Sequence, residues 1–144
     1  MHKGQISLDF MVIVVFAFII ILEIFHLYVT ETSSSRIIMG SISAKRVASI
    51  VARAIDEVSR ANGTSSLINL PESLDTAETY YLTVKASGRR VDVFWPISSE
   101  NRSVGVSILT SNATELNISK TVGSGETTLN ITNLNGAINI SEVS

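Results

Sequence analysis

The chain has 144 residues, no cysteine, two histidines and a net charge of −2 at pH 7. The lack of cysteine excludes thiol catalysis, disulfides and Cys-ligated zinc or iron–sulfur sites, and the small net charge gives no electrostatic reason to expect a nucleic-acid partner. A chain of this length has room for one membrane-type helix and one domain of roughly 100 residues.

The first 30 residues are the most hydrophobic part of the chain. Within residues 10–29 only Glu23 and His26 are titratable near pH 7, and as a helix this run would span roughly 30 Å, which matches the hydrocarbon core of a bilayer. An ordinary cleaved secretory signal is disfavoured, because Glu23, His26 and Tyr28 stand where its small-residue cleavage site would be. The sequence therefore predicts a transmembrane helix.

The residues that open this run, from Lys3 to Phe10, read KGQISLDF. The string resembles the class III signal peptides of archaeal type IV pilin-like proteins. In that family the leader ends in a charged residue and Gly, the mature chain begins with Gln, and Ser, Glu and an aromatic residue follow just before the apolar helix. The positions that match are Lys3, Gly4, Gln5, Ser7 and Phe10. Asp9 departs from the pattern, since the family usually has Glu there.

The resemblance implies a structural subunit of a surface filament that works in adhesion. A membrane prepilin peptidase would cut between Gly4 and Gln5 on the cytoplasmic side, and a platform protein and an assembly ATPase would help to build the filament. The precursor would sit in the membrane with its N-terminus in the cytoplasm, and the mature protein would self-associate into a helical filament at the cell surface. The implied regions are a leader (1–4), a filament-core helix (5–30), an amphipathic helix (31–63) and a β-rich extracellular domain (64–144).

Asp9 has two interpretations. Cleavage would create an α-amino group at Gln5, largely protonated near neutral pH, and a lone charge in lipid costs about 2.5–3.5 kcal/mol on insertion scales. Pairing of Asp9 with the terminal amine of a neighbouring subunit would remove that cost and fix the axial register of the helices in the filament. The residues expected to take part in assembly are therefore Gln5, Asp9 and Phe10. The alternative is that Asp9 interacts with the helix dipole at the bilayer surface.

An apolar repeat of 3.6 residues predicts that the amphipathic helix ends at Asn62-Gly63 and packs on the protein's own sheet. Its expected inward stripe is Ile38, Ile42, Val47, Val51, Ala54, Ile55 and Val58. We expect one long helix together with the apolar segment, and the Ser-rich residues 30–35 leave a bend or break there open.

The C-terminal part alternates between apolar and polar residues. After an expected loop at 64–77, residues 78–86 and 89–95 predict a β-hairpin. Its expected inward side chains are Tyr80, Leu82, Val84, Val91, Val93 and Trp95. Further short strands are expected at 103–110, 115–120, 126–131 and 137–143, the last after an Asn135-Gly136 turn. The predicted fold class is α+β, with the long helix packed on a small antiparallel β-sandwich or barrel-like sheet. This matches the lollipop arrangement that the resemblance to pilin-like proteins implies.

Six of the nine asparagines lie in Asn-x-Ser/Thr sequons: Asn62, Asn101, Asn112, Asn117, Asn130 and Asn139. Roughly two would be expected by chance in so Ser/Thr-rich a chain, so the excess favours an exported, glycosylated surface.

We expect no enzymatic activity, no metal and no cofactor. The two histidines lie in the N-terminal segment, and Asp56-Glu57 is most simply a solvated pair on a charged helix face. The alternative function is a singly anchored extracellular β-domain that keeps its N-terminus and binds an envelope partner, as stator-type or other surface proteins do.

Overall fold

The computed structural model describes residues 3–97 and 100–143, with side chains from residue 8 onward. A single α-helix precedes seven β-strands within these residues. The elements are α1 (Lys3–Ser59), β1 (Ser65–Leu70), β2 (Thr79–Lys85), β3 (Arg90–Ile97), β4 (Glu100–Ser107), β5 (Leu116–Thr121), β6 (Thr127–Leu134) and β7 (Ala137–Val143). The α+β class with antiparallel strands is therefore confirmed, and residues 37–144 form one compact unit.

The helix α1 runs without interruption through the Ser/Thr-rich residues 30–35, so the prediction of one long helix is confirmed. Hydroxyl groups in this stretch donate to backbone carbonyls one turn earlier. These bonds are Thr30 Oγ1 to His26 O (2.9 Å), Thr32 Oγ1 to Tyr28 O (2.6 Å), Ser33 Oγ to Val29 O (2.9 Å) and Ser34 Oγ to Thr30 O (3.1 Å). Because the helix supplies partners for these hydroxyls, residues with modest helix propensity continue the helix here.

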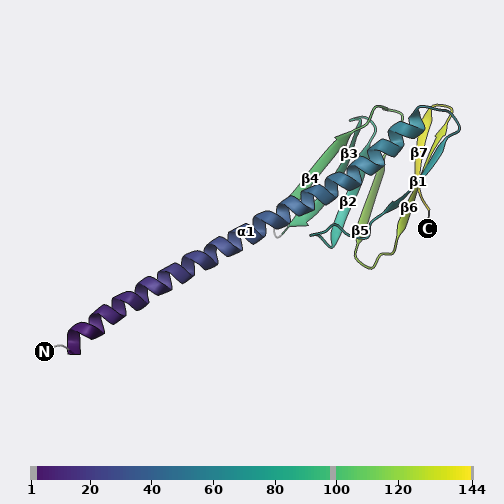
Figure 1. The fold of residues 1–144 in the computed structure, drawn as a ribbon. Helices are drawn as coiled ribbons and strands as arrows, with labels where there is room; N and C mark the ends of the chain where they lie inside the picture. The colour runs from purple at the N-terminus through teal and green to yellow at the C-terminus, as the bar shows by residue number, and fades with distance from the viewer. Residues whose placement is uncertain (1–2, 98–99, 144) are drawn as a thin grey trace. The chain divides into compact units, whose positions relative to one another are not determined.

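The strands form two antiparallel sheets, in the orders β4-β3-β2-β5 and β1-β6-β7. Figure 1 shows them gathered along the C-terminal part of α1. The predicted hairpin is β2–β3, and the predicted turn at Asn135-Gly136 joins β6 to β7. Asn135 and Gly136 have φ values of 56° and 84°, which a two-residue hairpin turn of the primed type requires.

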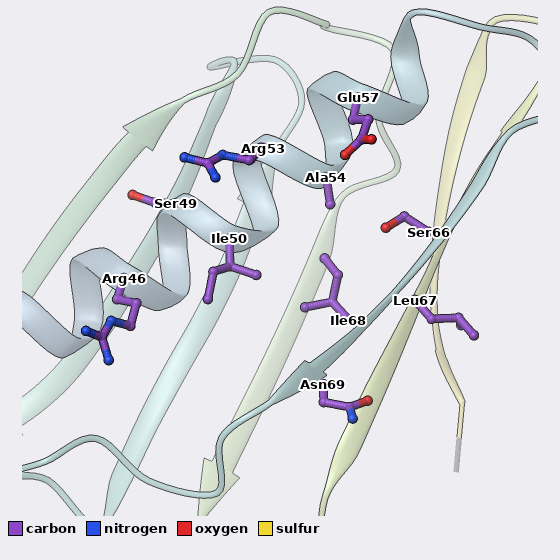
Figure 2. A pocket seen from close by; sticks show the side chains of 10 residues that line it. All are labelled: Arg46, Ser49, Ile50, Arg53, Ala54, Glu57, Ser66, Leu67, Ile68 and Asn69. Atoms are coloured by element: carbon purple, nitrogen blue, oxygen red, sulfur yellow. The ribbon is translucent and has the colours of Figure 1, made fainter.

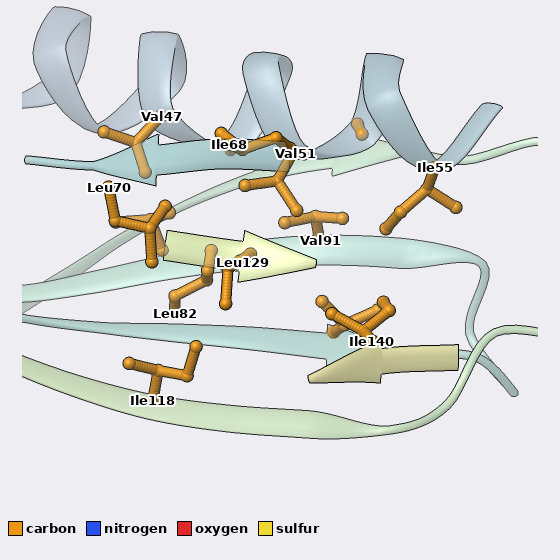
Figure 3. Close-up of a cluster of buried hydrophobic side chains, with 14 of the residues drawn as sticks. Val47, Val51, Ile55, Ile68, Leu70, Leu82, Val91, Ile118, Leu129 and Ile140 are labelled. Atoms are coloured by element: carbon orange, nitrogen blue, oxygen red, sulfur yellow. The ribbon is translucent and has the colours of Figure 1, made fainter. Parts of the chain in front are cut away.

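One hydrophobic core joins the helix to both sheets (Figure 3). All six side chains that the hairpin pattern placed inward are buried. Trp95 and Tyr80 belong to the core, whereas the neighbouring Tyr81 is 49% exposed, so the aromatic residues of β2 and β3 are divided between core and surface.

The predicted helix stripe is wrong at its N-terminal end. Ile38 and Ile42 are 57% and 59% exposed, and the buried positions there are Gly40 and Ala44. A Cβ added at Gly40 would lie 3.0 Å from Trp95 Nε1. The helix therefore approaches the sheets through small residues, which a search for large apolar side chains does not find.

The expected loop at 64–77 is also wrong in part, because its first half is strand β1. Only Ile68 and Leu70 of this strand are buried, and its pairing partner β6 begins more than fifty residues later in the chain. A strand with two inward apolar residues has a weak local signal, and here the distant partner stabilises it.

The helix covers one side of the space between the sheets, with β1 of one sheet and β4 of the other along its flanks. Asp56 is half-buried and its Oδ1 accepts a hydrogen bond from Leu109 N at 2.7 Å, so it ties the segment after β4 to the helix and is not simply a solvated residue. On another side Ala113 bridges to Ile138 of β7. The sandwich thus holds a complete core within residues 37–144.

Candidate functional site

The most unusual surface of the chain is the N-terminal part of α1. Every described side chain from Leu8 to Arg36 is exposed, including all the large apolar ones up to Val29. An 18-residue window of this helix has a mean hydropathy of 2.8. The segment is therefore long and apolar enough to anchor the protein in a membrane.

Asp9 places one carboxylate on this apolar surface. It is exposed, as is Phe10 next to it, and one turn further along the helix lie the exposed side chains of Val12 and Ile13. The helix begins at Lys3, so Asp9 lies beyond the first turn, where the interaction of a carboxylate with the helix dipole has largely decayed. Among the ion pairs of the described side chains none involves Asp9.

The backbone of Lys3, Gly4 and Gln5 belongs to α1. Their side chains lie outside the described part of the structure. The expected cleavage bond between Gly4 and Gln5 is thus in the first turns of the helix.

The sequons lie on the surface of the β-domain. Five of the six asparagines are exposed, namely Asn62, Asn101, Asn112, Asn117 and Asn139, and Asn130 is half-buried. None of them lies on α1, which ends before Asn62. Asn130 lies between the buried Leu129 and Ile131 on β6, and Asn139 lies between two buried isoleucines on β7, so both face away from the core on the same sheet.

A groove of about 620 Å³ lies between α1 and β1 (Figure 2). Ile50 and Ala54 lie across it from Ile68, and its ionisable lining residues, Arg46, Arg53 and Glu57, are all exposed. The charged groups that line this groove are therefore accessible to water.

Among the described residues of the domain, two side chains that carry a charge at neutral pH are buried, and both have structural partners. Lys120 Nζ donates to Gly125 O (2.6 Å) and Thr127 Oγ1 (2.7 Å), and Asp92 pairs with Arg90. Among the described residues no group of three or more His, Asp or Glu side chains could hold a metal ion.

Sequence reasoning missed the structural roles of Lys120, Asp92 and Asn133, which are buried polar residues in the described part of the domain. For Lys120 a signal was available, since it alternates with Leu116 and Ile118 on β5 and therefore takes an inward position. For Asn133 the alternation with Leu129 and Ile131 gives the same signal.

Comparisons with protein-family models, with curated proteins and with solved structures find no match to this chain.

Proposed function

We propose that the chain is a pilin-like subunit whose N-terminal helix packs with copies of itself in a surface filament. The observation that carries this proposal is the division of the chain into a β-domain with its own core and a helix segment whose side chains are all exposed. Since the domain's core does not use the segment from Leu8 to Arg36, its apolar surface must be covered by something else. Lipid covers it in the precursor, and neighbouring helices cover it in the filament.

Asp9 favours a helix bundle over a permanent lipid anchor. A carboxylate beyond the first turn of an apolar helix is costly in lipid, and such groups pair or face a polar site. After cleavage the α-amino group of Gln5 lies four residues before Asp9. An ion pair between Asp9 of one subunit and Gln5 of its neighbour would satisfy both charges and fix the axial register, because a slip would leave both unpaired in an apolar environment.

The β-domain is the displayed part of the subunit in this proposal. Its sequons lie on strands and connecting segments, and the helix is free of them. Glycans on these asparagines would cover the outer faces of the sandwich and leave the exposed side of α1 free for contacts between subunits. Leader removal by a prepilin peptidase, and assembly by a platform protein and an ATPase, follow from the same proposal, as does a role in adhesion without catalysis.

The test is to isolate surface filaments from the native source, image them by electron microscopy and identify their main protein by mass spectrometry. The proposal expects filaments that contain this chain, and the intact mass should exceed that of the polypeptide by one or more glycans. Recovery of the chain only as a dispersed membrane protein, from cells that do bear filaments of other composition, would contradict it.

A further inference from the structure

The two Asn-Gly dipeptides of the chain meet at the end of the domain where α1 finishes. Asn62-Gly63 follows the helix, and Asn135-Gly136 forms the β6–β7 turn. Asn135 N donates to Asn62 Oδ1 at 2.8 Å, and the two side chains are in contact through Asn62 Nδ2 and Asn135 Oδ1 at 3.5 Å. Residues 73 positions apart thus bring both dipeptides into one site.

Asn133 binds both glycine amides of this site. Gly63 N donates to the backbone oxygen of Asn133 at 2.9 Å, and Gly136 N donates to its side-chain Oδ1, also at 2.9 Å. The Asn133 side chain is 3% exposed. Its Nδ2 donates to Val58 O (3.0 Å) and Ala61 O (3.1 Å), two carbonyls at the end of the helix. The backbone oxygen, Oδ1 and Nδ2 of Asn133 thus all form hydrogen bonds, and this network keeps both glycine amides bound to Asn133.

These glycine amides are the nucleophiles of a known spontaneous reaction. In Asn-Gly sequences the glycine nitrogen attacks the asparagine Cγ, a C–N bond forms and ammonia leaves. Water then opens the resulting succinimide to aspartate or isoaspartate. Glycine at the second position speeds the attack because it has no side chain to hinder it. An amide that donates a hydrogen bond to Asn133 and is fixed in a left-handed turn cannot make this approach.

We propose that Asn62-Gly63 and Asn135-Gly136 form a latent deamidation site, which Asn133 keeps unreactive in the folded domain. The inference does not rest on the filament proposal, because it depends only on contacts within residues 58–136, and it applies to chains in which Asn62 carries no glycan. A deamidated Asn62 would place a carboxylate beside the last carbonyls of α1, where negative charge is unfavourable. Isoaspartate would in addition lengthen the main chain within the turn, so that the first reaction weakens the contacts that protect the second asparagine.

The test uses the full chain, produced without glycosylation and kept in detergent at mildly alkaline pH. Peptide mapping by mass spectrometry, with enzymatic methylation of isoaspartate, follows Asn62 and Asn135 over time. Because a protected amide reacts only from open states, we expect both sites to react at least roughly tenfold more slowly in the folded protein than in the same chain in urea. Equal rates in the folded and urea-unfolded chains would overturn the proposal.

Two variants separate protection by Asn133 from stability alone. Asn133→Ala removes the side-chain acceptor of Gly136 N but keeps the backbone acceptor of Gly63 N. Val91→Ala loses buried apolar atoms in the other sheet and leaves the site unchanged. With both compared at the same unfolded fraction in urea, Asn133→Ala should accelerate reaction at Asn135 more than at Asn62, and Val91→Ala should favour neither. Identical acceleration by the two variants would contradict the proposed role of Asn133.

Discussion

Gly105 of β4 lies directly opposite Asp92 of β3 in the sheet register. Asp92 alternates with the buried residues Val91 and Val93 and so points away from the core, yet it is 5% exposed. The side chain of Arg90 pairs with it over the position of Gly105, and Lys85 Nζ lies 3.9 Å from it. The ion pair thus occupies the space that a side chain at position 105 would fill.

Replacement of Gly105 with alanine should destabilise the domain. The added Cβ would overlap the Arg90 guanidinium and the Asp92 carboxylate, and overpacking of this kind typically costs about 1–3 kcal/mol. Gly88→Ala is the matched control, since its Cβ would meet Lys85 Cβ at an ordinary 3.8 Å. Urea unfolding measures both, and similar free energies of unfolding for the two variants would show that the space at Gly105 is not needed.

Tyr80 should make the domain sensitive to alkali. Its hydroxyl donates to Pro71 O at 2.6 Å, and burial raises the pKa of the phenol well above its ordinary value. Because the folded pKa exceeds the unfolded one, near 10, the stabilisation is complete below pH 10 and is lost as the pH rises above it, at up to about 1.4 kcal/mol per unit.

The variant Tyr80→Phe has no ionisable group at this position, so its free energy of unfolding should fall less between pH 9 and pH 11 than that of the unmodified protein. Tyr81→Phe changes an exposed residue, so the free energy of unfolding of this variant should fall between pH 9 and pH 11 as much as that of the unmodified protein. If the free energy of unfolding fell equally with pH in the unmodified protein and in Tyr80→Phe, a group other than Tyr80 would cause the loss of stability at alkaline pH.

Lys120 should stabilise the segment between β5 and β6. Its buried ammonium group donates to Gly125 O and Thr127 Oγ1. In Lys120→Met the charge is removed but the acceptors lose their partner, so we expect the free energy of unfolding to fall by about 1–3 kcal/mol. Lys45→Met at an exposed position of the helix should change it by less than about 0.5 kcal/mol. If Lys120→Met were as stable as the unmodified protein, the free-energy cost of burying the ammonium group would equal the stabilisation from its two hydrogen bonds, and the expectation would be wrong.

Asp9 gives the sharpest test of assembly. Asp9→Ala should remove the partner of the Gln5 amine and abolish or misregister filaments, whereas Asp9→Glu keeps the carboxylate and should assemble. Electron microscopy counts the filaments, and immunoblots check that both variants reach the membrane in equal amounts. Normal filaments from Asp9→Ala would show that the ion pair is not required.

The parts of the fold that follow from local patterns were predictable, and those that depend on distant partners were not. The apolar helix, the β2–β3 hairpin and the Asn135-Gly136 turn each have a signal within a few residues. By contrast, strand β1 depends on its pairing with β6, and the approach of the helix to the sheets depends on small residues such as Gly40, whose neighbour in space is Trp95.

The same distinction holds for the candidate sites. The string that begins at Lys3 predicts the proposed cleavage and assembly residues, and a three-residue pattern predicts the sequons. The role of Asn133 arises only when β6 reaches the end of α1 and the turn at Asn135. A residue such as Asn133, which forms hydrogen bonds to several distant segments, has no sequence signature beyond its inward position on a strand.

The most direct test of the central claim is the mature N-terminus of the exported protein. Intact-mass measurement and N-terminal sequencing of material from the cell surface should give a chain that begins at Gln5, without the four residues of the leader. The same chain expressed with Gly4→Val should keep its leader and remain in the membrane. Exported, surface-located protein that still begins at Met1 would contradict the account and would favour a singly anchored β-domain.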